Sequence, residues 1–337
     1  MAVWAAPSND PVLTQQILPL LADRLRQALS SVAPGVLETL EEIRVRVGRP
    51  LHLVVGDGEV FLPQAVVTAA DFRATLELIT GSSLYALEEE LRNGYITLPG
   101  GHRVGLAGRA VLENGRVRTL KHLSGLNFRV SREFPGAATD VLDVIWPIGA
   151  GSSAPAERPM SALIVSPPRA GKTTVLRDLA RLLSTGGPGR PGLKVVIVDE
   201  RSEIAGCFEG LPQKDVGPRT DVLDACPKAA GMMMALRSLG PEVLVADEIG
   251  RPEDAAAIHE AVNAGVTVVS SAHGASLEEI RRRPAIREII AGGAFGRYVF
   301  LGRRPAPGTV VAVLDGAGRP LDGAGRPLDG GQQPCPG

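Results

Sequence analysis

The sequence predicts an α/β protein with two domains: a smaller N-terminal α+β domain, then a doubly wound domain built on a mostly parallel sheet. From about residue 160, short continuous apolar runs alternate with stretches of helical periodicity, as expected for strands buried on both faces. Before about residue 131, the strictly alternating run 43–47 and the short β-like runs over 95–131 are typical of antiparallel strands. Residues 147–159 between them are rich in Gly, Ser, Ala and Pro, the composition of a linker.

The N-terminal elements follow from their periodicity and their turn residues. Residues 12–31 place leucine and isoleucine at helical spacing and predict an amphipathic helix. The alternating run 43–47, the run 51–55 and a Gly-Asp-Gly turn predict a hairpin. Residues 71–93 predict two helices, and the short β-like runs over 95–131 predict a small antiparallel sheet that completes the domain.

The second domain is predicted from the alternation of strand and helix patterns. Apolar runs too continuous for a one-faced sheet indicate parallel strands, and amphipathic stretches between them indicate the crossover helices. We expect strands at about 161–165, 194–198, 243–246 and 266–271, and helices at about 173–184, 227–239 and 252–264.

The domain limits follow from these elements. We expect an N-terminal domain over 1–146, a linker over 147–159 and the parallel-sheet domain over 160–314. A tail over 315–337 contains the heptapeptide Asp-Gly-Ala-Gly-Arg-Pro-Leu twice and continues with glycine and proline, so we expect it to be disordered.

The composition limits the function classes. Among 337 residues, 36 basic and 37 acidic side chains nearly cancel, so no global field attracts nucleic acid or acidic lipid. No apolar stretch approaches the roughly 18–20 residues of a membrane span, and Met1–Asp10 lacks the features of a signal peptide, so we expect a cytoplasmic protein. Cys207, Cys226 and Cys335 are far apart, which indicates neither a disulfide framework nor a zinc site.

Residues 166–174, Ser-Pro-Pro-Arg-Ala-Gly-Lys-Thr-Thr, lie between an apolar run and an amphipathic helix and predict a phosphate-binding loop. In the pattern G-x-x-x-x-G-K-[ST], backbone N–H groups surround a phosphate, the lysine reaches its oxygens, and the hydroxyl ligates Mg²⁺. Lys172 and Thr173 fit, whereas Ser166 replaces the first glycine. The predicted nucleotide-binding residues are Ser166, Pro167, Pro168, Arg169, Ala170, Gly171, Lys172, Thr173 and Thr174.

An acidic pair follows the apolar run 243–246. Asp247 and Glu248 are predicted to end a buried strand, which brings carboxylates to the nucleotide at the carboxyl edge of the sheet. We expect Asp247 to hold Mg²⁺ through water and Glu248 to polarise the attacking water.

A second acidic cluster and a histidine end two other predicted strands on that edge. Asp199, Glu200 and Glu203 are plausible metal or water ligands, although Arg201 can equally neutralise them in a structural role. His273 ends the strand at 266–271, where a structural role and a γ-phosphate sensor are both open.

Long motifs carry a resemblance to a known family. The segments 42–51, 100–108, 198–206, 212–224, 226–234 and 247–251, among them Val-Asp-Glu-Arg-Ser-Glu-Ile-Ala-Gly and Asp-Glu-Ile-Gly-Arg, resemble the stage III sporulation protein AA family. The resemblance implies a RecA-like ATPase of the type II and type IV secretion superfamily. It also implies work in the mother cell of an endospore-forming bacterium, energising an envelope-spanning channel to the forespore.

The resemblance also implies site residues. The loop lysine of secretion ATPases falls on Lys172, their Asp box on Asp199 with Glu200 and Glu203, their second acidic motif on Asp247 with Glu248, and their His box on His273. Family members also use arginines from a neighbouring domain or subunit, and the candidate donors are Arg103, Arg109, Arg219 and Arg251.

These observations predict an ATP- and Mg²⁺-dependent motor that forms a homo-oligomeric ring, a hexamer. We expect its N-terminal domain to dock membrane proteins of a sporulation channel, so that a cytoplasmic protein associates peripherally with the membrane. A nucleic-acid-dependent P-loop ATPase is the alternative, but only 4% of residues are aromatic, and we expect no nucleic-acid partner. A nucleotide-gated scaffold with little turnover is the other alternative.

Overall fold

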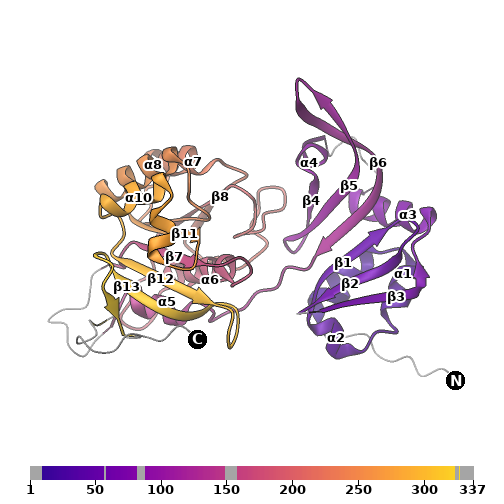
Figure 1. The fold of residues 1–337 in the computed structure, drawn as a ribbon, viewed down its shortest axis with the longest axis horizontal. Coiled ribbons are helices and arrows are strands. Elements are labelled where there is room, and N and C mark those ends of the chain that lie inside the picture. The colour runs from indigo at the N-terminus through magenta and orange to yellow at the C-terminus, as the bar shows by residue number, and fades with distance from the viewer. Residues whose placement is uncertain (1–9, 57, 82–87, 149–157, 323–325, 327–337) are drawn as a thin grey trace. The chain divides into compact units, whose positions relative to one another are not determined.

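The computed structural model describes residues 10–56, 58–81, 88–148, 158–322 and 326, in two compact units (Figure 1). The units are Met1–Arg132 and Glu133–Gly337. In the part of the chain that is described, no helix has the length and apolar character of a membrane span.

The first unit is built on a six-stranded antiparallel sheet in the order β3-β2-β1-β6-β5-β4. The predicted hairpin is present as β1 and β2, and the predicted antiparallel region joins the same sheet. The strands are β1 Leu40–Arg46, β2 Pro50–Val55, β3 Gly58–Val66, β4 Tyr95–Leu98, β5 His102–Glu113 and β6 Arg116–Arg129.

The helices of the first unit differ from the prediction over 12–31, and a short helix at Pro34–Glu38 was not predicted. The single helix predicted over 12–31 is three short pieces, because Pro19 begins a new turn and Leu21 is extended. Thr68 and Asp71 form a capping box at the start of α3, and Gly81 ends it in the left-handed conformation. The pieces are η1 Val12–Ile17, η2 Leu18–Leu20 and α1 Asp23–Leu29, followed by α2 Pro34–Glu38, α3 Ala69–Thr80 and α4 Glu88–Asn93.

The second unit is built on an eight-stranded sheet in the order β14-β13-β12-β7-β11-β10-β8-β9. The strands from β12 to β9 are parallel to one another, whereas β13 and β14 run antiparallel. The four predicted strands correspond to β7 Ala162–Ser166, β8 Val195–Asp199, β10 Val243–Ala246 and β11 Thr267–His273. The three predicted helices correspond to α6 Lys172–Thr185, α7 Lys228–Ser238 and α8 Pro252–Asn263.

The remaining elements of this unit were not predicted as helices or strands. Several are short and β13 is largely half-exposed, so the patterns of these are weak, whereas β12 is a continuous buried run and α10 is amphipathic, and the prediction missed both. They are α5 Thr139–Ile145, β9 Thr220–Asp224, α9 Leu277–Arg281, α10 Pro284–Ala291, β12 Arg297–Gly302, β13 Thr309–Asp315 and β14 Pro320–Leu321.

Helices cover both faces of this sheet (Figure 1). Alternate residues of each parallel strand face opposite cores: Ile164 packs with α5 and α6, whereas Leu163 and Val165 pack with α7 to α10. Burial on both faces explains the continuous apolar runs of the sequence. The topology places the carboxyl ends of β7, β11, β10 and β8 on one edge of the sheet.

Two of the expected domain limits need correction. The boundary moves from residue 146 to between Arg132 and Glu133, because α5 buries its apolar face in the core of the second unit. The tail does not begin at 315, because β14 pairs with β13 and Leu321 enters that core. Most of the predicted linker, 149–157, and residues 323–325 and 327–337 lie outside the described residues.

Candidate functional site

The phosphate loop connects β7 to α6 and explains how a serine replaces the first glycine. Ser166 is the last residue of β7, is 1% exposed, and donates its hydroxyl to the carbonyl of Pro167 at 2.9 Å. The left-handed conformations fall instead on Arg169, with φ of 61°, and on Gly171, with φ of 80°. Ser166 therefore does not need the backbone freedom of glycine, because the left-handed residues of the loop are Arg169 and Gly171.

Lys172 begins α6 and points to the end of β11. Its Nζ lies 2.8 Å from Nδ1 of His273, and β11 places His273 in register with Ser166. Because an ammonium group has no acceptor, Nδ1 accepts this hydrogen bond and Nε2 carries the ring proton. Burial lowers the pKa of Lys172 below its usual value, although the negative charges of Asp247 and Glu248 act to raise it.

Asp247 follows β10 and faces the start of α6. Its Oδ2 accepts a hydrogen bond from the Thr173 hydroxyl at 3.0 Å, and its Oδ1 accepts one from the Ser271 hydroxyl. Ser271 also accepts the amide N–H of Glu248 at 3.1 Å. Sequence reasoning missed Ser271, whose signal was the Ser-Ser-Ala-His run that ends a strand.

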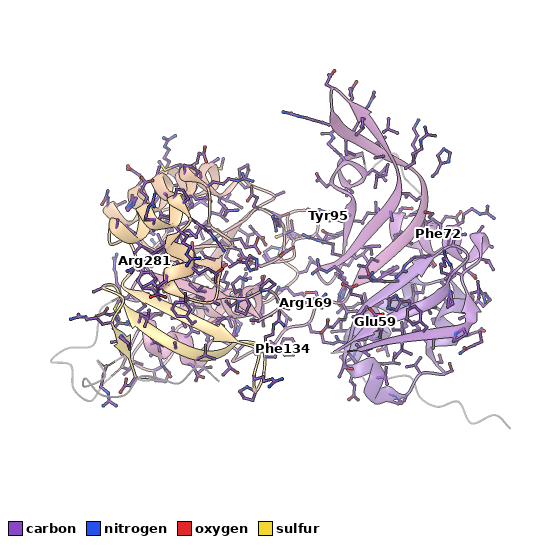
Figure 2. All side chains as sticks on the ribbon, in the orientation of Figure 1. Glu59, Phe72, Tyr95, Phe134, Arg169 and Arg281 are labelled. Atoms are coloured by element: carbon purple, nitrogen blue, oxygen red, sulfur yellow. The ribbon has the colours of Figure 1, made fainter. Side chains whose placement is uncertain are left out.

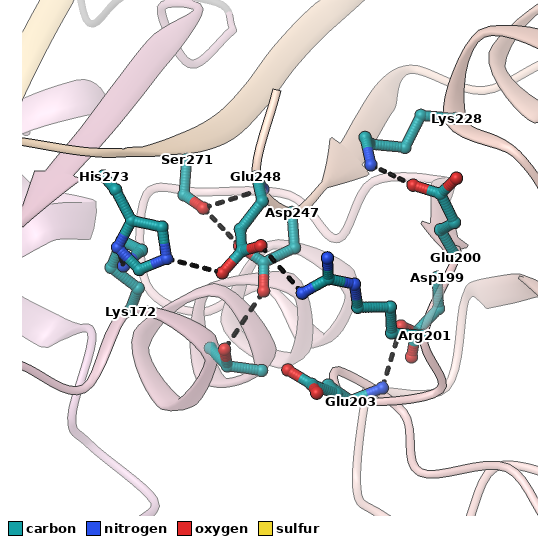
Figure 3. Close-up of polar contacts among 11 residues, drawn as sticks. Lys172, Asp199, Glu200, Arg201, Glu203, Lys228, Asp247, Glu248, Ser271 and His273 are labelled. Atoms are coloured by element: carbon teal, nitrogen blue, oxygen red, sulfur yellow. Dashed lines mark hydrogen bonds and ion pairs between the residues drawn. The ribbon is translucent and has the colours of Figure 1, made fainter. Parts of the chain in front are cut away.

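Glu248 lies between a histidine and an arginine (Figure 3). Its Oε1 is 2.7 Å from Nε2 of His273, and its Oε2 is 3.1 Å from a guanidinium nitrogen of Arg201. The φ of Glu248 is 49°, a conformation that costs a non-glycine residue energy and that aims its side chain. The structure therefore brings Lys172, His273 and Glu248 into one hydrogen-bonded series.

The cluster after β8 divides into different roles. Asp199 is 2% exposed, and its two oxygens accept amide N–H groups of Glu203, Ile204 and Ala205 at 2.8–2.9 Å. Burial raises the pKa of Asp199, and these three donors oppose the rise. Because its oxygens are engaged in shaping the loop, this geometry favours a structural role over the predicted metal ligation.

Glu200 and Glu203 lie beside this loop but are held differently. Glu200 pairs with Lys228, and Arg251 approaches it to 3.5 Å. Burial alone would raise the pKa of Glu200, but these cations hold it below its usual value. Glu200 and Glu203 line a small notch together with Asp247 and Glu248, so the structure brings both predicted acidic groups to one place.

The candidate arginines lie in different places. Arg219 binds the carbonyl of Ser184 at 2.8 Å at the end of α6, which spans 14 residues, so it lies about 20 Å from the loop of its own chain. Arg251 lies near Glu200 at the edge of the site. Arg103, 4.1 Å above the ring of Tyr95, and Arg109 are both on β5 of the first unit.

The turn between β12 and β13 contacts the phosphate loop, which sequence reasoning missed. Arg303 donates from Nε to the carbonyl of Pro168 at 3.2 Å, and a second guanidinium nitrogen donates to the same oxygen. The amide of Gly308 donates to the carbonyl of Ala170 at 2.9 Å. A Cβ at Gly171 would lie 3.0 Å from the Gly308 nitrogen, so this close approach requires glycine in the loop.

The donors around Thr173 suit a hard cation. The Thr173 hydroxyl and the Asp247 carboxylate are oxygen donors, the type that Mg²⁺ prefers, and Mg²⁺ is usually bound by one or two carboxylates plus substrate phosphates. Among the described residues, no group of at least 3 His, Cys, Asp or Glu side chains could hold a metal by itself. The residues present therefore fit Mg²⁺ that arrives with a nucleotide.

Comparisons with known proteins agree with this fold. The DotB ATPase of Legionella pneumophila superposes with a TM-score of 0.54 at 16% identity, over 82% of this chain and 74% of that one. The pilus retraction motor PilT with bound ADP superposes with a TM-score of 0.52 at 16% identity, over 79% and 75%. The second unit therefore has the RecA-like fold of secretion ATPases, preceded by a smaller α+β unit.

The sequence comparisons identify the family. Stage III sporulation protein AA of Bacillus subtilis (strain 168) is 44% identical over 306 residues, which cover 91% of this chain and 96% of that protein. The family model described as sporulation stage III, protein AA matches residues 13–321. The chain belongs to the stage III sporulation protein AA family, as its motifs predicted.

Proposed function

We propose that the chain is an ATP-binding and ATP-hydrolysing motor of the secretion-ATPase type. The observation that carries this proposal is the series of contacts from Lys172 through His273 to Glu248, beside the Thr173–Asp247 pair. Three separate segments of the chain, the start of α6, the end of β11 and the residues after β10, supply these side chains to one edge of a parallel sheet. This is the edge at which nucleotides bind in such folds.

Lys172, the loop amides and the amino end of α6 would bind the phosphates. The helix dipole and the free N–H groups of its first turn favour an anion there, and the ammonium adds charge-assisted hydrogen bonds. Thr173 and Asp247 would hold Mg²⁺, which when bound neutralises charge on the phosphate oxygens. Ser271 orients the Asp247 carboxylate through its hydroxyl.

Glu248 is the proposed general base. It would accept the proton of the attacking water at one carboxylate oxygen, while His273 and Arg201 hold the carboxylate in place. His273 acts as a positioning residue, because Lys172 sets its tautomer and its Nε2–H is directed at Oε1 of Glu248. The proposed base therefore responds to the position of the phosphate-binding lysine.

The family supports the wider proposal of a ring that works in sporulation. In this proposal six copies assemble, an arginine from a neighbouring subunit or from the first unit completes each site, and nucleotide turnover energises a channel between mother cell and forespore. The motor would be cytoplasmic and would reach the membrane through partner proteins of that channel.

ATP hydrolysis by the purified full chain tests this function. We expect Mg²⁺-dependent release of phosphate that rises per subunit with protein concentration and does not respond to single-stranded DNA or RNA. Stimulation by nucleic acid would favour the nucleic-acid-dependent ATPase. Tight ATP binding without turnover at any concentration would favour the nucleotide-gated scaffold.

A further inference from the structure

A groove lies in the first unit, whereas the nucleotide-binding residues belong to the second. Its volume is about 830 Å³, and it is formed by α3, α4 and the ribbon of β5 and β6. Figure 1 shows this ribbon extending beyond β1 to β3. The strand pairing shows the same extension: residues 125–129 of β6 pair with β1, whereas residues 116–121 of β6 pair only with β5.

The floor of the groove is apolar. Phe72 of α3 (Figure 2) is 4% exposed, and half-buried leucines from α3, α4 and β6 surround it. These leucines are Leu76, Leu91, Leu120 and Leu123. Covering a recessed apolar floor of this kind with apolar side chains of another molecule is favourable relative to leaving it exposed to water.

The rim of the groove is basic. Arg73, Arg92, Arg118, Lys121 and His122 line it, all of them exposed, and no aspartate or glutamate is among its described lining residues. Arg118 approaches Glu113 to 3.5 Å, whereas Arg73, Arg92 and Lys121 form no ion pair with any described residue. Positive and negative side chains nearly cancel over the whole chain, 36 against 37, so this rim is a local concentration of positive charge.

We propose that this groove binds an acidic amphipathic segment of a protein partner. An amphipathic helix places its apolar face in such a groove through residues at i, i+3, i+4 and i+7, and acidic residues along its sides would meet the basic rim. The basic groups lie on three separate elements, so one compact anionic ligand would leave some of them unmatched.

The shape of the groove argues for a peptide over a lipid surface. The apolar residues lie at the floor, below exposed basic side chains, and a flat bilayer cannot reach them while it contacts the rim. The phosphate site lies in the other unit, so this proposal does not depend on the proposed function.

Two labelled peptides test the proposal with the full-length protein. Both have about four helical turns and leucines at i, i+3, i+4 and i+7, and one has glutamate where the other has lysine. We expect saturable binding of the acidic peptide alone, measured by fluorescence anisotropy. A third peptide that keeps the glutamates but replaces the leucines with glutamine should not bind.

Charge reversal on the protein locates the binding. Arg73→Glu and Lys121→Glu change exposed side chains, and each should weaken binding of the acidic peptide by about tenfold, since like charges oppose each other at the rim. Arg49→Glu, on the exposed β1–β2 turn outside the groove, is the matched control and should bind like the parent.

The other outcomes overturn the proposal. Equal binding of the acidic and basic peptides, no saturable binding, or unchanged affinity in both groove variants would each do so. Vesicles of phosphatidylglycerol and of phosphatidylcholine form the last arm. Binding to the anionic vesicles that Arg73→Glu and Lys121→Glu abolish, together with no peptide binding, would assign the groove to a lipid surface.

Discussion

Nε2 of His273 lies 2.7 Å from Oε1 of Glu248, so the end of β11 holds the acid that follows β10. The same imidazole accepts a hydrogen bond from Lys172 at 2.8 Å, which sets its tautomer. One histidine therefore connects the phosphate-binding lysine to the proposed base. The contact with Glu248 gives His273 an orienting role in either of the two cases that the sequence left open, a structural residue or a γ-phosphate sensor.

Glu248→Gln should retain ATP binding and slow hydrolysis by about 10²–10⁴-fold, the scale for losing a general base. Glutamine keeps the shape of the side chain but cannot accept the proton. Single-turnover hydrolysis and nucleotide titration separate the two effects. Glu203→Gln is the comparison, and a larger loss there with a mild effect of Glu248→Gln would move the catalytic role to the loop after β8.

Lys172→Ala should nearly abolish ATP binding. Its ammonium makes charge-assisted contacts worth about 1.5–3 kcal/mol each, and no neighbouring side chain can replace them. Lys194→Ala removes an exposed lysine just before β8, at the opposite edge of the sheet, and should leave the affinity unchanged. An affinity of Lys172→Ala within about twofold of the parent would refute the phosphate-loop assignment.

Arg303→Ala should weaken ATP binding by about threefold to tenfold, the scale of one net hydrogen bond. Arg303 donates twice to the carbonyl of Pro168 and so holds the phosphate loop from the β12–β13 turn. Arg303→Lys should recover part of the affinity, and Arg304→Ala, its exposed neighbour, is the control. Equal effects of Arg303→Ala and Arg304→Ala would exclude this positioning role.

Asp71→Asn should destabilise the first unit by about 2 kcal/mol at neutral pH. Arg24, with Thr68, lowers the pKa of Asp71 from 3.8 to about 2. Because the folded-state pKa lies below the unfolded one, this stabilisation is present above about pH 4 and is lost as the pH falls through about 2. Urea unfolding of parent and variant should therefore converge in acid, whereas Asp23→Asn, at a largely exposed carboxylate, should behave like the parent.

Complementation between variants should show that the site is shared. Lys172→Ala is expected to be inactive at its own site but to keep its arginines, so mixing it with an Arg→Ala variant should restore turnover at mixed interfaces. An arginine supplied in trans contributes about 10³–10⁵ in rate. Arg103, Arg109, Arg219 and Arg251 are tested one at a time. Full activity of a dilute monomer, confirmed by light scattering, would contradict the shared site.

The sequence predicted the parts of the fold that have a strong local signal. The buried strands β7, β8, β10 and β11 are continuous apolar runs, and α6 has a clear amphipathic period, so each was placed to within a few residues. The prediction of one helix over 12–31 took no account of Pro19, which interrupts it. Leu321 was missed because two residues of an edge strand carry no periodicity, and only their pairing with β13 orders them.

The sequence by itself predicted the phosphate loop and the acids and histidine at the strand ends, because each motif needs only neighbours along the chain. Their connections depend on the tertiary structure. The pairing of β11 with β7 places His273 beside Ser166, and the β12–β13 turn brings Arg303 onto the loop from 135 residues away along the chain. Asp199 was assigned to a metal from its position at a strand end, but folding surrounds it with three backbone donors. Hydrogen-bond partners at such separations depend on the register and order of strands, which no local pattern encodes.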